Sequence, residues 1–156
     1  MPMRLPARTR SGQTVTGSSR TTAPVAYLDS SAIVKQVVEE AESTSLDRWL
    51  TRTRHRLVTS RVAWVEVPRA VALVAGEAGL AFARSVLSEH NTWEVTPAVA
   101  DDAARMAGTH LMSLDAIHLA SARACAAEVL VTYDRRLASQ TRALGLRVEH
   151  PGVLPG

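Results

Sequence analysis

The stretch V-A-Y-L-D-S-S-A-I-V-K, from Val25 to Lys35, decides the fold class. Its first four residues form a short apolar run that is typical of a buried β-strand, and the run ends at Asp29. Directly after it, Ile33 and Val37 take the spacing of one helical face. A buried strand followed at once by an amphipathic helix is the repeating unit of α/β proteins.

The same alternation continues along the chain. Further strands are predicted at residues 56–59, 93–95, 129–132 and 146–148. Helical spacing predicts further helices around Leu46 and Leu50, through Val62 and Val74, over 77–89 and 114–127, and around Leu137 and Leu144. Ser60 is expected to cap the second of these helices and Pro68 to kink it, whereas Thr96 and Pro97 form a helix start. We therefore predict an α/β fold with three layers, α/β/α, around a mostly parallel sheet of four to five strands.

The chain has 156 residues, which suits a single domain. Residues 1–24 carry four arginines and no acid, and they are rich in Ser, Thr, Gly and Pro. We expect a disordered basic tail over 1–24. It is a disordered extension, the product of a start codon assigned too far upstream, or an arm that binds nucleic acid. The folded domain is expected over 25–151 and a short C-terminal tail over 152–156.

Composition excludes several classes of protein. Only 4% of the residues are aromatic, too few for a surface on which RNA bases stack. The single cysteine, Cys125, excludes an internal disulfide and fits a reducing compartment. The sequence has no apolar run long enough for a membrane span and no glycine-rich phosphate loop. These observations predict a cytoplasmic protein that does not enter the membrane.

Four acidic residues stand in otherwise apolar surroundings. Asp29 and Asp134 follow predicted strands, Asp115 lies in the first turn of a helix, and Glu66 lies about two helical turns after a strand. Each has a local explanation as a turn residue, a helix cap or a partner of the helix dipole. In α/β folds, however, ligands bind beyond the carboxyl ends of the strands. All four acids are expected at that edge of the sheet.

Carboxylates that meet at one edge repel one another, so their pKa values are expected to be raised in the native state. A divalent cation would relieve this repulsion. An all-oxygen shell selects Mg²⁺ or Mn²⁺, and such an ion activates water and stabilises a phosphoryl transition state. The acids thus indicate metal-assisted hydrolysis.

At these residues the chain resembles the PIN-domain nucleases, and most closely the VapC-type ribonuclease toxins. The resemblance spans residues 26–151 and rests on Y-L-D-S-S-A-I-V-K, D-A-I-H-L-A-S-A and L-V-T-Y-D-R-R-L in this order. It implies a PIN-like fold and an endoribonuclease that uses Mg²⁺ or Mn²⁺, forms a homodimer and is silenced by a cognate antitoxin.

The resemblance also assigns roles to residues. It implies that Asp29, Glu66, Asp115 and Asp134 are catalytic, with Asp29, Asp115 and Asp134 on the metal. The small hydroxyl residue of the family matches Ser30 or Ser31.

Three further residues near these acids have two interpretations each. His118 lies on the same helix face as Asp115, and it either orients Asp115 or contacts substrate, or is a structural histidine. Arg135 and Arg136 either contact RNA phosphates or face solvent. Two other functions also stay open: an RNA-processing nuclease without a toxin role, and a non-catalytic module whose acidic pocket binds a partner.

Overall fold

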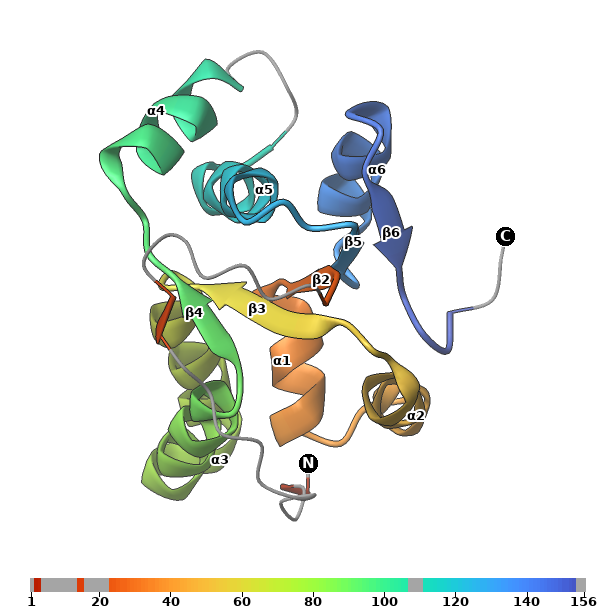
Figure 1. Cartoon of the computed structure of the whole chain (residues 1–156). Helices are drawn as coiled ribbons and strands as arrows, with labels where there is room; N and C mark the ends of the chain where they lie inside the picture. The colour runs from red at the N-terminus through yellow and green to blue at the C-terminus, as the bar shows by residue number, and fades with distance from the viewer. Residues whose placement is uncertain (1, 4–13, 16–22, 107–110, 154–156) are drawn as a thin grey trace.

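The strands run parallel in one sheet, and helices cover both of its faces (Figure 1). The computed structural model of the chain describes residues 2–3, 14–15, 23–106 and 111–153. The strands are β1 (Thr14–Val15), β2 (Val25–Leu28), β3 (Arg56–Ser60), β4 (Asn91–Trp93), β5 (Val129–Val131) and β6 (Arg147–Glu149). The helices are α1 (Ser30–Val37), α2 (Ser43–Arg52), α3 (Ala63–Ser88), α4 (Pro97–Arg105), α5 (Ser113–Ala124) and α6 (Arg135–Ala143).

The strand order places a switch point in the middle of the sheet. The order is β1-β4-β3-β2-β5-β6, so the chain moves from β2 to β4 in one direction and then resumes at β5 on the other side of β2. All pairs between these strands are parallel. The switch point between β2 and β5 is where ligands bind in open α/β sheets, and Asp29 and Asp134 follow these two strands.

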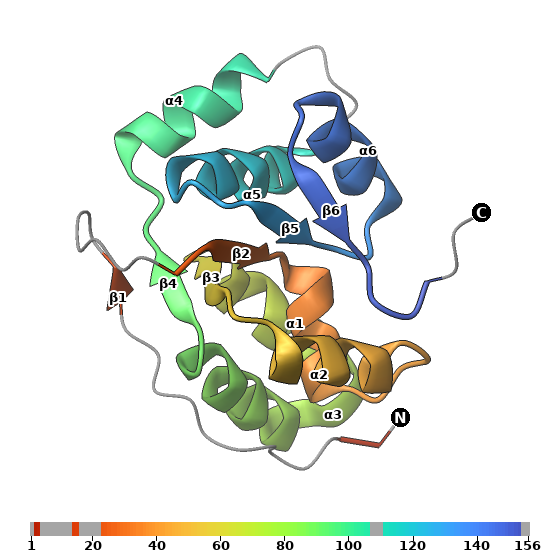
Figure 2. The ribbon, with the colours of Figure 1, turned by 45° about the vertical axis from the view of Figure 1, so that its right-hand side comes forward.

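Helices α1, α2 and α3 lie on one face of the sheet, and α4, α5 and α6 lie on the other (Figure 2). Alternate residues of β2 pack into the two hydrophobic cores, one on each face of the sheet. Ala26 and Leu28 belong to the core beside α1 and α3, whereas Val25 and Tyr27 belong to the core beside α5 and α6. The expected three-layer α/β/α architecture is confirmed, and the buried apolar runs reflect a sheet that is covered on both sides.

The third helix combines two predicted helices, the one through Val62 and Val74 and the one over 77–89, which meet at Gly76. Pro68 lies inside α3 without breaking it, and the backbone leaves helical geometry at Gly76, with φ 59° and ψ −152°. Such a conformation is open essentially to glycine alone, so two helical segments meet at this residue. At Pro68, where a kink was expected, the backbone keeps helical φ and ψ. Ser60 is not the N-cap, because α3 begins at Ala63 and its N-cap is Val62; the Ser60 Oγ accepts from the Val62 N–H at 3.3 Å.

Strand β4 is displaced by two residues from the predicted strand at 93–95. Pairing with β3 sets its place, with Val58 opposite Asn91 and Ser60 opposite Trp93. The predicted helix start at Thr96 is confirmed, because its Oγ1 accepts from the Val99 N–H at 3.3 Å.

Two pieces of the N-terminal segment contact the domain. Thr14–Val15 pairs with β4 at the edge of the sheet, and Met3 forms an antiparallel bridge with Val38. Residues 1, 4–13 and 16–22 lie outside the described residues, as do 154–156. The expectation of a disordered tail over 1–24 therefore stays a prediction.

Among the described residues, α3 is the one helix long and apolar enough to cross a membrane by length and composition. Core helices of soluble proteins meet the same criterion. One face of α3 is buried in the domain through Val67, Val71 and Leu87, and the helix is broken at Gly76. This helix does not indicate a membrane protein.

Candidate active site

Each of the four predicted acids has a local structural reason for its position. Asp29 is the N-cap of α1, where its Oδ1 accepts from the Ala32 N–H at 3.1 Å. Asp134 caps α6 and accepts from two backbone N–H groups at 2.7 and 3.0 Å. Asp115 lies in the first turn of α5 and Glu66 in that of α3. Helix N-termini favour negative charge, so the sheet edge gathers acids at the starts of four helices.

Asp29 is the most deeply buried of these acids, with 4% of its surface exposed. Its Oδ1 accepts from the Ser31 hydroxyl at 2.7 Å, and its Oδ2 accepts from the Thr132 hydroxyl at 2.8 Å. Burial raises its pKa, although the charge of His118 and these hydrogen bonds act in the opposite direction. Thr132 Oγ1 also accepts from the Asp134 N–H at 3.0 Å. One threonine thereby ties the two aspartates together.

Glu66 forms a separate cluster with His118 and Ser30. Its Oε2 lies 2.6 Å from His118 Nε2 and accepts from the Ser30 hydroxyl at 2.6 Å. On the other side of the ring, His118 Nδ1 lies 2.7 Å from the hydroxyl of the buried Tyr27. A carboxylate only accepts, so His118 Nε2 carries the hydrogen and donates it to Glu66.

This cluster corrects the expectation that all four acids have raised pKa values. Burial alone would favour the protonated form of Glu66, but the hydrogen bond and charge of His118, together with Ser30, lower its pKa. The side chain of His118 is 3% exposed, and it contacts Glu66, which is 52 residues away in the sequence. His118 thus holds Glu66 rather than Asp115 by a hydrogen bond.

Asp115 approaches the site from the first turn of α5. Its Oδ2 accepts from the Met112 N–H at 3.3 Å. Burial and the charge of Asp134 raise its pKa, whereas the Met112 N–H and the charges of Arg136 and His118 lower it. The expected repulsion is therefore present between Asp115 and Asp134, although burial is the larger cause.

The two arginines beside Asp134 are exposed, as the solvent-facing interpretation requires. Arg136 Nη2 lies 3.9 Å from Asp134 Oδ2, and no ion pair of Arg135 is found within the described part of the chain. Both guanidinium groups stay accessible to an anionic ligand.

Comparisons with known proteins identify the family of the chain. The family model of the PIN domain matches residues 26–142. Ribonuclease VapC35 of Mycobacterium tuberculosis is 41% identical over 131 residues, which cover 81% of this chain and 96% of the relative. Ribonuclease VapC46 of the same species is 42% identical over 127 residues, covering 80% and 96%. The chain belongs to the PIN-domain family.

Solved structures show the same PIN-domain fold. The crystal structure of Mycobacterium tuberculosis VapC20, described as a Sarcin-Ricin loop cleaving toxin, has a TM-score of 0.65 at 14% identity and covers 74% of this chain and 94% of that one. A toxin-antitoxin complex from Klebsiella pneumoniae has a TM-score of 0.56 at 22% identity, covering 70% and 86%.

PIN-domain ribonucleases generally depend on a divalent metal. Within the residues that the structure describes, no three acidic, histidine or cysteine side chains form a ready-made ligand group. Mg²⁺ does not need one, because it is usually bound by one or two carboxylates and keeps several waters. The carboxylate oxygens of Asp29, Asp115 and Asp134 are the type of donor that such an ion takes. It would also offset the burial that raises the pKa values of Asp29 and Asp115.

Sequence reasoning missed three members of the site: Tyr27, Thr132 and Tyr133. Tyr27 contacts His118, Thr132 joins Asp29 to Asp134, and the Tyr133 N–H donates to Ser31 Oγ at 2.8 Å. The sequence did offer a signal for them, because Tyr27 is a polar residue inside the apolar strand β2, and Thr132 and Tyr133 directly follow the apolar strand β5. Ser30 and Ser31, predicted as alternatives, serve different acids: Ser30 bonds Glu66 and Ser31 bonds Asp29.

Proposed function

We propose that this PIN domain is an endoribonuclease that hydrolyses RNA phosphodiester bonds with Mg²⁺ or Mn²⁺. The observation that carries this proposal is the link from Asp29 through Thr132 to Asp134 at the switch point of the sheet. Asp115, whose pKa responds to the charge of Asp134, borders the same link. The ribonuclease names of the relatives at 41% and 42% identity support the same activity.

In this mechanism Asp29, Asp115 and Asp134 would hold the cation. When bound, a divalent ion activates water and stabilises the charge that develops on the phosphoryl group. The protein supplies the remaining steps. Because its pKa is lowered, Glu66 is an ionised acceptor that orients water for in-line attack or holds a second ion, and His118 and Ser30 fix its direction. Arg135 and Arg136 bind the flanking phosphates.

We further propose that the chain is a toxin held inactive by a cognate antitoxin in the cytoplasm. The toxin-antitoxin complex among the solved neighbours supports this partner. We also propose a homodimer. Leu73 of α3 is 88% exposed and its neighbour Val74 is exposed as well, and a second copy would cover these apolar side chains. Light scattering on Leu73→Glu tests this, because the variant is expected to be monomeric.

The experiment that tests the activity is incubation of purified protein with total cellular RNA in Mg²⁺, in Mn²⁺ and in EDTA. Discrete fragments are expected with either ion and intact RNA in EDTA. Cleavage that persists in EDTA would contradict the role of the metal. Intact RNA in all three conditions, with the protein folded, would contradict the proposed activity and favour the non-catalytic binding module.

An RNA-processing nuclease is the second candidate, and it shares the same site. Expression in a host cell separates the two. A toxin stops growth, and co-expression of its antitoxin restores growth. A processing nuclease leaves growth unchanged.

A further inference from the structure

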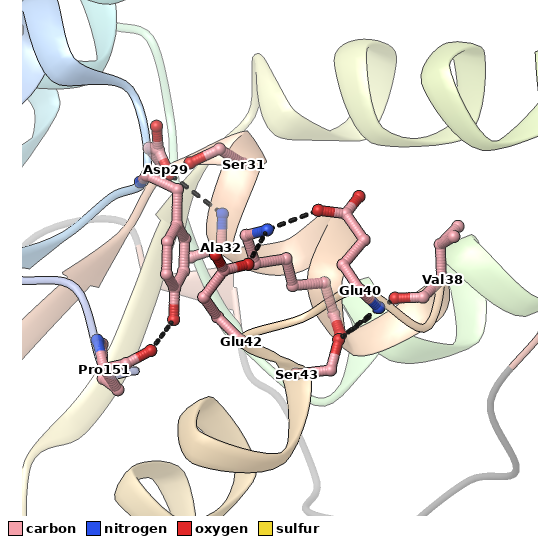
Figure 3. A network of polar contacts seen from close by, with 10 residues as sticks. Asp29, Ser31, Ala32, Val38, Glu40, Glu42, Ser43 and Pro151 are labelled. Carbon is pink, nitrogen blue, oxygen red and sulfur yellow. Dashed lines mark hydrogen bonds and ion pairs between the residues drawn. The ribbon is translucent and has the colours of Figure 1, made fainter. Parts of the chain in front are cut away.

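Lys35 is the only lysine among the 18 basic side chains of the protein, and it is buried in α1, six residues after Asp29. Its ammonium group donates to Glu40 and, at 2.7 Å, to Glu42 Oε2 (Figure 3). Burial opposes the charge, but the hydrogen bonds and charges of the two glutamates outweigh it and raise the pKa of Lys35. The side chain is therefore a fixed cation inside the domain.

The two glutamates are themselves held in place. They lie in the turn between α1 and α2, where Ser43 Oγ donates to the Lys35 carbonyl at 2.7 Å and accepts from the Glu40 N–H at 3.0 Å. The turn and the lysine thus fix each other. Figure 3 shows Glu40, Glu42 and Ser43 of this turn.

The same ammonium group contacts a residue of the site. It lies 4.7 Å from the centre of the Tyr133 ring, within the range of a cation–π interaction. The hydroxyl of Tyr133 donates to the Pro151 carbonyl at 2.9 Å. Burial is the main cause that raises the pKa of Tyr133, so this hydroxyl stays a donor. The ring is held at its face by Lys35 and at its hydroxyl by the segment after β6.

The backbone of Tyr133 reaches Asp29 through one hydroxyl group. Its N–H donates to Ser31 Oγ at 2.8 Å, and the Ser31 hydroxyl donates to Asp29 Oδ1 at 2.7 Å. Because the incoming N–H occupies a lone pair of Ser31, the serine hydrogen is directed to the carboxylate. Moving the Tyr133 backbone would therefore turn Asp29.

We propose that Lys35 is a positioning residue for the acidic site: through the face of Tyr133 it fixes the Tyr133 N–H, and thereby Ser31 and Asp29. This role rests on the proposed function, since Asp29 is assigned there to the metal. A lysine suits the place because a compact ammonium has three rotatable donors, enough for two carboxylates and a ring face, whereas a guanidinium is a planar fork.

The first test needs no activity. Amide hydrogen exchange at Tyr133 is measured by NMR in metal-free wild type, in Lys35→Met and in Tyr133→Leu. Loss of the Lys35 ammonium or of the Tyr133 ring is expected to speed exchange at this amide at least about tenfold, because the segment at residue 133 then opens more easily. Tyr133→Phe keeps the ring and is expected to stay close to wild type. The matched control is Arg48→Met, which removes one exposed positive charge. Unchanged exchange in Lys35→Met would overturn the proposal.

The second test uses RNA cleavage. Lys35→Met is expected to lower kcat about tenfold and to raise the Mg²⁺ concentration for half-maximal rate, with KM for RNA unchanged. The double variant with Tyr133→Leu is expected to be no slower than either single variant, because both break one link. The proposal would be overturned if the decreases in kcat of the two single variants multiplied in the double variant, or if KM changed while kcat did not. If Lys35→Met does not fold, Tyr133→Leu and Lys35→Arg replace it. Lys35→Arg keeps the positive charge, so its kcat must fall less than that of Tyr133→Leu.

The two tests separate the failure of this proposal from the failure of the proposed function. Wild type that cleaves no RNA contradicts the function, and the amide exchange of Tyr133 still decides whether Lys35 fixes the site. Active wild type with an unchanged Lys35→Met variant contradicts the role of Lys35 alone.

Discussion

At the scale of the residue, Asp115 is a carboxylate whose environment disfavours its charge. Burial and the charge of Asp134 raise its pKa. An acid with a raised pKa binds more protons in the native state, so metal-free protein loses stability as pH rises from the unfolded to the folded pKa. Above that range, Asp115→Asn is expected to stabilise the metal-free protein by about 1 kcal/mol, given water screening. Thermal melts in EDTA measure this gain.

The same melts test the metal. Mg²⁺ is expected to stabilise wild type by mass action, about 2.7 kcal/mol at a hundredfold excess over Kd, and Asp115→Asn much less. An equal rise of both melting temperatures would show that Asp115 is a helix-start residue outside the metal site.

The pKa of Glu66 is shifted in the opposite direction to that of Asp115, because it is lowered. Its effect on the pH dependence of stability is therefore also opposite. Its ionised form contributes stability above the unfolded pKa, and this contribution is lost as pH falls through the folded value. In His118→Gln the imidazole is gone and burial becomes the dominant influence, so the pKa of Glu66 is expected to rise above its ordinary value. Carboxyl ¹³C NMR titration measures it directly. His55→Gln is the control, because His55 lies directly before β3, at the opposite end of the strand from Glu66, and this variant should leave the pKa of Glu66 unchanged.

At this scale, sequence reasoning placed the four acids at helix starts beside strand ends. It could not pair Glu66 with His118, because no local pattern reports a contact across 52 residues. The raised pKa values were expected from mutual repulsion, whereas the structure adds burial and, for Glu66, a histidine that reverses the shift.

At the scale of the element, α3 is two helical segments joined at Gly76. A Cβ at this residue would meet no atom within 4 Å, so any effect of Gly76→Ala comes from the backbone alone. We expect a loss of about 1–2 kcal/mol, because φ of 59° with ψ of −152° is strained for alanine. Urea unfolding measures this loss. Equal or greater stability would mean that a continuous helix fits the domain.

The elements also show why prediction succeeded in part. Apolar runs and helical spacing predicted the strand–helix alternation and the Thr96 cap, because both depend on neighbouring residues. The place of β4 depends on its register with β3, which is not a local relation. The boundary between the helix predicted through Val74 and the helix predicted over 77–89 falls at Gly76, where the backbone leaves helical geometry, so this break was predicted from the sequence.

At the scale of the whole molecule, the N-terminal segment contributes a two-residue strand to the sheet edge. So short a pairing adds little stability. Deletion of residues 1–23 is expected to lower the melting temperature by less than about 5 °C. It is also expected to reduce the salt dependence of RNA binding, because four arginines are lost. A larger drop in melting temperature would show that the segment is an integral part of the fold.

The central claim is that the acids at the ends of β2 and β5 hold the ion on which RNA hydrolysis depends. The most direct test is the rate of RNA cleavage by wild type and Asp29→Asn across a Mg²⁺ titration, with circular dichroism to verify folding. We predict that wild-type cleavage saturates with Mg²⁺, and that folded Asp29→Asn keeps less than about a tenth of this rate at every concentration. A folded Asp29→Asn that cleaves RNA at the wild-type rate would contradict the account.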